Sequence, residues 1–373
     1  MRIAIDGHMV GQRETGNESY VVNLLRGLAA APGKDSFQVL TPDPRRVAAE
    51  IALPSQFRFV RVWPATSALR IPFGMPAALR AQRSDLLHAT YILPPRAPCP
   101  MVVTVHDLSF IPFPQALTPR ARLLLRWLVP LSVRRAARVI AISEFTRQDL
   151  IRYYDIPPDK IRVTLLAADP AYGRNGQGDL SQLPEGVREP FILAVGNLEP
   201  RKNLSRLVDA FVHLVRAQGF QGQLVLAGNP RGSSQRLLQQ LRTLGLESRV
   251  LMPGYVSKAQ LRSLYNQAAV FVFPSLYEGF GLPTLEAMAC GCPVVSSNVT
   301  SLPEVVGDAA IQVDPDSTAK LAEAIDAVIV RPELARELRA KGLRRASMFS
   351  WRKTAEQTRG VYGEAVASKR LRR

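Results

Sequence analysis

The sequence VFVFPSLYEGFGLPTLEAMACGCPVVSS occupies residues 270–297 and contains a complete strand–loop–helix–strand unit. Val270–Phe273 is an apolar, β-prone run, and Pro293–Ser296 is a second one. Between them, Pro283 suits the first turn of a helix, and Gly291 ends that helix. Two buried strands joined by a helix predict a parallel sheet with helices on its faces.

The same alternation of apolar β-prone runs and helical runs continues in both directions from this unit. In the second half the predicted strands are Phe191–Val195, Gln223–Ala227, Val250–Met252, Val270–Phe273, Pro293–Ser296 and Ala310–Val313. In the first half they are Arg2–Asp6, Phe37–Leu40, Phe57–Val62, Leu86–Ala89, Met101–His106, Val139–Ile142 and Ile161–Leu165. Predicted helices include Asn17–Ala31, Pro119–Arg138, Leu204–Gln218, Ser234–Leu244, Lys258–Asn266, Thr318–Val328 and Trp351–Val366.

Two successive sets of parallel strands predict an α/β protein made of two doubly wound, Rossmann-like domains. Composition places an N-terminal domain over 1–170, a Gly- and Pro-rich linker over 171–190, a C-terminal domain over 191–350, and a final helix with a basic tail over 351–373. Ligands of such sheets bind beyond the carboxyl ends of the strands. Two facing domains of this kind are therefore expected to enclose a cleft.

The composition excludes several classes of protein. With 47% hydrophobic and 21% charged residues among 373, the chain is typical of a folded globular protein. No apolar run approaches the roughly 20 residues of a membrane-spanning helix. The sequence DPD at 314–316 has a form used for metal–nucleotide binding in some enzymes, but it precedes a predicted helix and is interpreted as a turn and cap. Free buried thiols and no metal site are expected for the three cysteines, which are Cys99, Cys290 and Cys292.

The chain is strongly basic: 48 Lys and Arg face 31 Asp and Glu, which gives a formal net charge of +17. Residues 335–373 alone hold 12 basic and 3 acidic residues. Such a balance favours partners that are polyanions, namely nucleic acid, an anionic membrane surface or phosphorylated substrates. Because 40 of the 48 basic residues are Arg, a GC-rich genome is an alternative source of the excess.

The segment EGFGLPTLE, Glu278–Glu286, carries the most specific pattern. Gly279 allows the backbone to approach a ligand closely. Glu278 and Glu286 are expected to face one pocket from its two ends. A tight strand–helix turn, with Glu286 as a surface acid, is the alternative. Backbone donors and the dipole at a helix N-terminus favour an anion, and the amides expected there are those of Gly281, Leu282 and Thr284.

The segment GNLEPRKNL, residues 196–204, again follows a predicted strand and precedes a helix. Arg201 and Lys202 at the carboxyl end of a strand form a candidate phosphate clamp. Asn203 is expected to cap the helix. Cations oppose the dipole at a helix N-terminus, which indicates that something anionic offsets them. A solvated helix start is the alternative.

The N-terminal domain contributes a loop over residues 11–18. Thr15 and Glu18 have the spacing of a capping box, which explains the loop structurally. The loop lacks a dinucleotide-binding glycine pattern, but Gly16 is small enough to bring backbone amides against a phosphate.

Two histidines end predicted strands of this domain. His106 ends the run VTVH, is followed by Asp107, and is the candidate for handling protons near neutral pH. A core histidine with satisfied partners is the alternative. His88 ranks below His106.

Together these segments resemble the retaining glycosyltransferases of family 4 (GT4), which have the GT-B fold of two facing Rossmann-like domains. The resemblance rests on EGFGLPTLE with the following AMACGCPVVSS, on GNLEPRKN, on PGYV at 253–256, on VHD at 105–107 and on AISEFT at 141–146. These motifs follow the family's order across nearly the whole chain. The overall pattern, including HDLSFIPFPQ at 106–115, is most similar to bacterial mannosyltransferases of O-antigen and exopolysaccharide assembly.

The resemblance implies a role for each matching residue. The implied catalytic residues are His106, Glu278, Arg201 and Lys202. The implied donor-binding residues are Gly16, Asn197, Tyr255, Val256, Gly279, Phe280, Gly281, Leu282, Thr284 and Glu286. In this assignment Glu278 contacts the donor sugar and Glu286 binds the ribose. Arg201 and Lys202 neutralise the diphosphate, His106 lies beside sugar and acceptor, and no metal or other cofactor is needed.

The chain departs from the family's pattern at two places. Asn197 stands where many relatives have Arg, five residues before Lys202, so Arg201 is expected to take over that role. The N-terminal loop has Thr15-Gly16-Asn17 in place of the family's common Gly-Gly pair.

The implied donor is a nucleotide sugar, with GDP-mannose expected and UDP-sugars as the alternative. The implied acceptor is a lipid-linked sugar or oligosaccharide at the bacterial inner membrane, so a cytoplasmic protein peripheral to that membrane's inner face is expected. The helix 119–138, rich in arginine, is a candidate contact with anionic lipid, and a buried helix with an arginine-rich edge is the alternative. Motifs of nucleic-acid-binding proteins are not evident. A catalytically inactive binder of sugar nucleotides is the remaining alternative.

Overall fold

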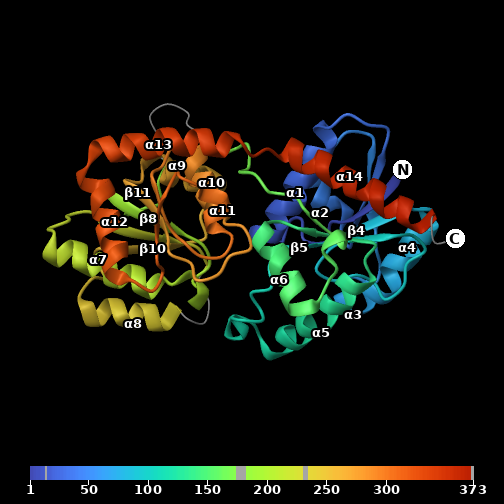
Figure 1. Cartoon of the computed structure of the whole chain (residues 1–373), viewed down its shortest axis with the longest axis horizontal. Helices are drawn as coiled ribbons and strands as arrows, with labels where there is room; N and C mark the ends of the chain where they lie inside the picture. Colours follow the sequence, from blue (N-terminus) through green and yellow to red (C-terminus); the bar gives the residue numbers. More distant parts are fainter. Residues whose placement is uncertain (13–14, 174–181, 230–233, 371–373) are drawn as a thin grey trace. The chain divides into compact units, whose positions relative to one another are not determined.

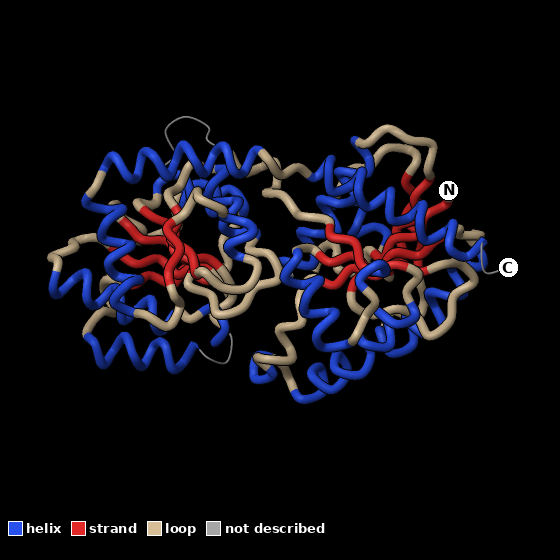
Figure 2. Tube along the Cα trace, viewed as in Figure 1, coloured by secondary structure: helices blue, strands red, loops and turns tan. Residues whose placement is uncertain are grey.

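The computed structural model describes residues 1–12, 15–173, 182–229 and 234–370. The chain divides into two compact units. The first unit comprises Met1–Leu166 together with Ser350–Arg373, and the second comprises Ala167–Phe349. In each unit a central sheet is flanked by helices, drawn red and blue in Figure 2. Within the described residues, no helix is both long enough and apolar enough to cross a membrane.

The sheet of the first unit has seven parallel strands in the order β3-β2-β1-β4-β5-β6-β7. The order changes direction between β1 and β4, and ligands of doubly wound sheets bind beyond the strand ends at such a point. The strands are β1 (Arg2–Asp6), β2 (Ser36–Thr41), β3 (Phe57–Arg61), β4 (Leu86–Thr90), β5 (Met101–Val105), β6 (Arg138–Ala141) and β7 (Ile161–Val163).

Helices cover both faces of this sheet. In Figure 1, α1 (Thr15–Ala30) and α14 (Trp351–Arg370) lie above the strands of this unit. The helices drawn below the strands are α3 (Ser67–Leu69), α5 (Pro119–Arg135) and α6 (Glu144–Tyr154). The unit also contains α2 (Pro44–Glu50), the π-helical turn η1 (Arg70–Gly74), α4 (Met75–Ala81), and the short turns η2 (Pro114–Ala116) and η3 (Pro158–Lys160). One apolar core joins α4, α5 and α6 to the sheet, and it includes Leu79, Val129 and Leu150.

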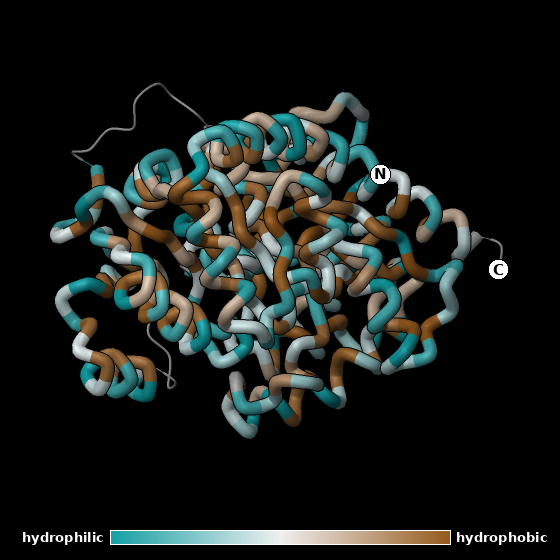
Figure 3. The backbone as a smooth tube through the Cα atoms, turned by 60° about the vertical axis from the view of Figure 1, so that its left-hand side comes forward, coloured by the Kyte–Doolittle hydropathy of each residue, from teal (hydrophilic) through white to brown (hydrophobic). Residues whose placement is uncertain are grey.

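The sheet of the second unit has six parallel strands in the order β10-β9-β8-β11-β12-β13. They are β8 (Phe191–Val195), β9 (Gln223–Ala227), β10 (Val250–Gly254), β11 (Val270–Phe273), β12 (Val294–Ser297) and β13 (Ile311–Val313). The helices are η5 (Pro200–Lys202), α7 (Leu204–Ala217), α8 (Ser234–Leu244), α9 (Lys258–Gln267), α10 (Leu282–Ala289), α11 (Leu302–Val306), α12 (Thr318–Val330) and α13 (Pro332–Ser347). Leu207, Phe211 and Leu214 of α7 are spaced i, i+4 and i+7, and all three face the core. Figure 3 shows the resulting mixture of hydrophobic and hydrophilic segments along the backbone.

The predicted α/β architecture with two doubly wound sheets is confirmed, and each predicted strand is found within about two residues of its expected ends. The interpretation of DPD as a turn is also confirmed, because Asp314 Oδ1 accepts from the Asp316 amide and Ser317 caps α12. All three cysteines are free and buried, as expected. Part of the predicted linker, residues 174–181, lies outside the described residues.

Two predicted helix caps are wrong. Helix α1 already begins at Thr15, and the Glu18 carboxylate accepts from the Gly11 amide at 2.6 Å, so Glu18 closes the preceding loop instead of a capping box. Asn203 adopts a left-handed conformation (φ +57°) and makes no side-chain cap. Its amide donates to Pro315 O at 2.8 Å, which ties the start of α7 to the turn before α12.

The C-terminal helix α14 packs on the first unit, against α1 (Figure 1). The Tyr362 hydroxyl bonds to His88 Nδ1 at 2.7 Å, and Arg359 pairs with Asp35 at 2.8 Å. Gly27 makes this approach possible, because a Cβ at Gly27 would lie 2.5 Å from the backbone oxygen of Trp351. The chain therefore returns to its first sheet after completing the second.

Gly27→Ala is expected to lower the free energy of unfolding by about 1–3 kcal/mol, because the added methyl group meets backbone that cannot rotate away. Urea unfolding measures the change. Gly360→Ala in α14 is the matched control, since a Cβ there meets nothing within 4 Å and alanine favours the helix. Equal effects of the two substitutions would contradict the close packing of α1 on α14.

Candidate active site

The loop between β11 and α10 depends on Gly281. Its φ of +100° is unfavourable for other residues, and a Cβ there would lie 2.5 Å from Leu302 Cδ2. Helix α10 begins at Leu282 with Pro283 in its first turn, as predicted. However, Thr284 donates both its amide and its hydroxyl to Gly281 O, at 2.9 and 2.7 Å. The expectation that the Thr284 amide faces an anion is therefore wrong, which leaves the amides of Gly281 and Leu282.

Glu278 is buried, and one of its carboxylate oxygens forms ion pairs with two cations. Lys202 Nζ lies 2.6 Å from Glu278 Oε1, and Arg201 Nη1 lies 3.0 Å from the same atom. Arg201 also pairs with Glu199 Oε2 at 2.9 Å. The Lys202 ammonium lies over the ring of Phe273, 4.6 Å from its centre, in a cation–π contact. The turn η5 thus brings both predicted clamp residues onto the predicted catalytic glutamate.

The four charges of this cluster balance within the chain. Burial raises the pKa of Glu278, but Lys202 and Arg201 outweigh it and hold the pKa below its ordinary value. Burial lowers the pKa of Lys202, against the opposite pull of Glu278. The anionic groups that offset the two cations are therefore Glu199 and Glu278 of the chain itself, which agrees with the inference that something anionic offsets them. An ammonium has three donors, so Lys202 can bond Glu278 and a phosphate together.

The main chain of Glu278 is held by a second loop, which follows β12. The Glu278 amide donates to Thr300 Oγ1 at 3.2 Å, and Ser301 Oγ donates to Glu278 O at 2.9 Å. The Phe280 side chain is buried, with its ring edge-on to Phe349 at 6.1 Å. Only the main chain of Phe280 is therefore left to meet a ligand. Sequence reasoning missed Thr300 and Ser301, because hydroxyl residues after a strand carry no specific signal.

Glu286 has a polar environment of its own. It lies in the second turn of α10, partly buried, and the Tyr265 hydroxyl donates to its Oε2 at 3.2 Å. Burial raises the pKa of Glu286 to about 7, the Asp169 carboxylate adds to the rise, and Tyr265 and Lys258 oppose it. Glu286 is thus no ordinary surface acid. Tyr265 was missed because it lies inside a predicted helix; its ring is edge-on to Tyr172.

Three more predicted donor-binding residues follow β8 and β10, which flank β9 in the sheet. Asn197 follows β8, and among the described residues its Oδ1 has no hydrogen-bond partner although it is buried. Tyr255 is 52% exposed and Val256 is partly buried, both just before α9. Ser257 and Gln260 then form a capping box that fixes the start of α9.

In the first unit, His106 follows β5 directly and is buried. Its Nδ1 lies 2.5 Å from Asn17 Oδ1, an atom that can only accept, so Nδ1 carries the hydrogen. Burial lowers the pKa of His106 to about 4, although Asp107 opposes the shift, so the ring is neutral at neutral pH. Nε2 is then an acceptor, and it has no hydrogen-bond partner among the described residues. Asp107 bonds Ser109 instead of the histidine.

His88 and Gly16 have different surroundings. Both ring nitrogens of His88 are engaged at 2.7 Å, one by Thr104 Oγ1 and the other by Tyr362, and burial lowers its pKa to about 3. His88 therefore links β4 and β5 to α14 and has no free ring nitrogen. Gly16 is exposed in the first turn of α1, and a Cβ there would meet nothing within 4 Å.

Comparison with known proteins decides the family. Residues 15–171 match the family described as Glycosyltransferase Family 4, and residues 179–345 match Glycosyl transferases group 1. The O-antigen chain mannosyltransferase B of Escherichia coli is 36% identical over 296 residues, 76% of each chain. This chain belongs to glycosyltransferase family 4. The predicted resemblance is confirmed.

Two further relatives of this family 4 enzyme are informative. The serotype-specific mannosyltransferase WbdA of Escherichia coli is 35% identical over 228 residues, which cover 59% of this chain and 28% of WbdA. The structure of a sucrose-phosphate synthase from Thermosynechococcus elongatus is similar with a TM-score of 0.80 and 25% identity, covering 99% of this chain and 100% of the other. The fold is therefore GT-B, and the protein is a retaining glycosyltransferase with a nucleotide-sugar donor and a glycan acceptor.

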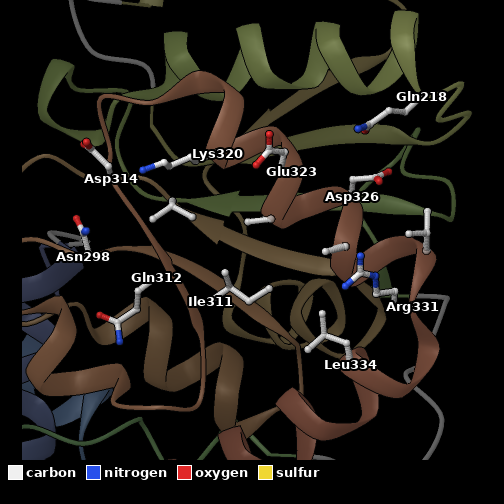
Figure 4. Close-up of a pocket in the computed structure, with 14 residues that line it drawn as sticks. Gln218, Asn298, Ile311, Gln312, Asp314, Lys320, Glu323, Asp326, Arg331 and Leu334 are labelled. Carbon is white, nitrogen blue, oxygen red and sulfur yellow. The ribbon is translucent and has the colours of Figure 1, made fainter.

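A separate hollow of about 780 Å³ lies in the second unit of the family 4 enzyme, at the sheet edge (Figure 4). It is lined by β13 and α12, with Asp314, Lys320 and Glu323 among its polar side chains. None of the predicted site residues lines it. The described residues also contain no group of three or more His, Cys, Asp or Glu side chains arranged to hold a metal ion.

Proposed function

We propose that this enzyme transfers mannose from GDP-mannose, with retention of the anomeric configuration, to a hydroxyl of a lipid-linked or oligosaccharide acceptor. The reaction would serve assembly of a bacterial surface polysaccharide. The observation that carries the proposal is the similarity to an O-antigen mannosyltransferase across three quarters of both chains. WbdA, a second mannosyltransferase, supports the same sugar.

In this proposal the second unit holds the donor. Glu286 accepts hydrogen bonds from the ribose hydroxyls. Asn197 Oδ1, which has no partner among the residues that the structure describes, accepts from an N–H or O–H group of the nucleotide. The main chain at Tyr255 and Val256 borders the base. The backbone of Gly279, Phe280, Gly281 and Leu282 surrounds the sugar and the diphosphate, with Thr284 holding the turn.

The clamp acts on the charge that develops during reaction. The bond from the anomeric carbon to the diphosphate oxygen breaks, and both electrons go to that oxygen. Lys202 and Arg201, which are both paired with the Glu278 carboxylate before the reaction, would stabilise the new charge without reorganisation. The carboxylate of Glu278 accepts hydrogen bonds from the sugar hydroxyls and holds both cations in position.

The first unit contributes His106 and Gly16. A neutral imidazole with its Nδ1 hydrogen fixed by Asn17 offers Nε2 as an acceptor for a hydroxyl of the sugar or the acceptor. The acceptor hydroxyl attacks the face that the diphosphate leaves, and its proton passes to the departing phosphate oxygen. Gly16 brings the backbone of α1 to the diphosphate.

Nucleotide-dependent thermal stability is the first test. GDP, UDP and ADP are each added at about a hundred times a micromolar dissociation constant, which stabilises a specific binder by roughly 2.7 kcal/mol. A shift with GDP alone supports the proposal, and one with UDP alone replaces GDP-mannose by a UDP-sugar. No shift with any nucleotide in a folded sample overturns the proposal.

Turnover is the second test. Release of GDP from GDP-mannose, with a lipid extract as the acceptor, separates an enzyme from a binding protein. Binding of GDP-mannose without release under these conditions would support the catalytically inactive alternative.

A further inference from the structure

Helix α5 exposes large apolar side chains on the side away from its core. Trp127 is 66% exposed and Leu123 is 59% exposed, and Leu124 and Leu131 are exposed as well. Positions 124, 127 and 131 are spaced i, i+3 and i+7, and 123 and 127 are spaced i and i+4, so the four side chains form one stripe. The opposite side of α5 packs into the core through Val129. The alternative of a buried helix is therefore wrong.

A second apolar group lies on the same side of the sheet. Phe73 of η1 is 66% exposed, Leu69 of α3 is exposed, and Trp63 before them is 79% exposed. The backbone of Trp63 lies against Gly74 at the end of η1. Ile71 of η1 packs on the same core cluster as α5, and Figure 1 places α3 and α5 below the strands. We call Trp63, Leu69, Phe73 and the α5 stripe together the apolar face.

The segments that build the apolar face carry positive charge without negative charge. Residues 51–84 and 108–143 contain no Asp or Glu. Helix α5 carries five exposed arginines, which are Arg120, Arg122, Arg126, Arg134 and Arg135. An exposed apolar area among basic residues matches a surface that is apolar below an anionic layer.

We propose that the apolar face docks on an anionic lipid bilayer, with α5 lying in the plane of the interface. Trp127 and the leucines would enter the boundary between headgroups and acyl chains, and the arginines would reach the phosphates on long apolar stems. A nucleic acid would offer the apolar side chains no comparable partner. The proposal goes beyond the proposed function, since it holds whichever donor the enzyme uses.

The basic C-terminal segment is less suited to this role. Its residues are divided between α13 of the second unit and α14 of the first. Several of its cations are already paired within the chain: Lys341 with Glu337, Arg352 with Glu356, and Arg359 with Asp35. An excess of positive charge alone therefore does not identify the docking surface. Basic residues next to exposed Trp and Leu side chains identify it.

Sedimentation with vesicles tests the proposal on the full chain without any nucleotide. The full chain is expected to bind vesicles that mix phosphatidylcholine with phosphatidylglycerol, and to bind pure phosphatidylcholine at least tenfold more weakly. Leu124→Ser with Trp127→Ser is expected to reduce binding to the mixed vesicles by at least tenfold. Arg122→Gln with Arg126→Gln is expected to reduce binding to the mixed vesicles and to leave the weak binding to neutral vesicles unchanged.

The matched control is Leu238→Ser with Val330→Ser, which removes two exposed apolar side chains from the second unit. Unchanged circular dichroism and an unchanged nucleotide-induced thermal shift show that each variant is folded and that its second unit is intact. Equal binding of the control and the α5 variant would overturn the proposal. Loss of a dimer in the α5 variant, without vesicle binding by the wild type, would assign the face to a second copy of the chain instead. Failure of the nucleotide test alone would overturn the proposed function and leave this proposal standing.

Discussion

Lys202→Met is expected to lower kcat/KM for donor turnover by about a thousandfold, an effect typical of removing a preorganised charge from a developing anion. Lys202 Nζ lies 2.6 Å from Glu278 Oε1, and both side chains are buried. In the proposed mechanism, the substitution removes a cation that faces the leaving group. It also leaves Glu278 with Arg201 as its remaining cationic partner in the cluster, so the carboxylate is held less firmly.

Steady-state kinetics with GDP-mannose, or with the donor that binding identifies, measure this loss. Glu278→Gln should be similarly impaired, and the double variant should lose far less than the product of the two single losses, because the residues act as one unit. Lys341→Met is the matched control, since Lys341 is paired with Glu337 at the surface of α13. Wild-type turnover by a normally folded Lys202→Met enzyme would contradict the role of Lys202 in stabilising the diphosphate.

Glu286→Gln is expected to change how stability depends on pH. The pKa of Glu286 is about 7 in the folded protein and 4.5 in its ordinary state. Between these values the folded protein holds a proton that the unfolded chain has released, so the Glu286 contribution to stability falls as pH rises through this window. At full size, a shift from 4.5 to about 7 corresponds to about 3 kcal/mol.

Urea unfolding at about pH 5 and about pH 8 measures the free energy of unfolding of the wild type and the variant. The change of their difference with pH is the contribution of Glu286. Glu286→Gln should gain stability relative to the wild type as pH rises, and it should bind nucleotide more weakly at the higher pH because glutamine offers a weaker acceptor to the ribose. Tyr265→Phe should raise the pKa of Glu286 further, since it removes the hydroxyl that donates to the carboxylate. A difference that does not vary with pH would show that Glu286 is ionised throughout.

The strands of both sheets can be predicted from sequence because the spacing of hydrophobic residues and the residue composition are local properties of the chain. Val270–Phe273 is apolar at every position, and Pro283 marks the first turn of α10 in the structure as in the prediction. The helix caps were less predictable. Asn203 has the right chemistry to cap α7, but a backbone carbonyl at Pro315, distant in sequence, competes for its side chain.

The candidate site, too, was predictable only in part. The motifs EGFGLPTLE and GNLEPRKNL indicate Glu278, Arg201 and Lys202, but no local feature of the sequence indicates that these two motifs lie in contact. Their ion pairs join positions separated by more than seventy residues, and they exist because β8 and β11 are neighbours in the sheet. Tyr265 and Asn17 were missed for the same reason, since each matters only through the distant side chain that it contacts.

By itself, the sequence determined the alternation of strands and helices, the two-domain α/β class, the family and the residue types of the site. These follow from local periodicity and from motifs that are contiguous in the chain. The tertiary structure alone decided which charges neutralise each other, which nitrogen of His106 remains an acceptor, which unit α14 joins, and which side of α5 is left exposed. Those outcomes depend on packing between segments far apart in sequence, because burial and pairing belong to the folded chain and not to any single stretch of it.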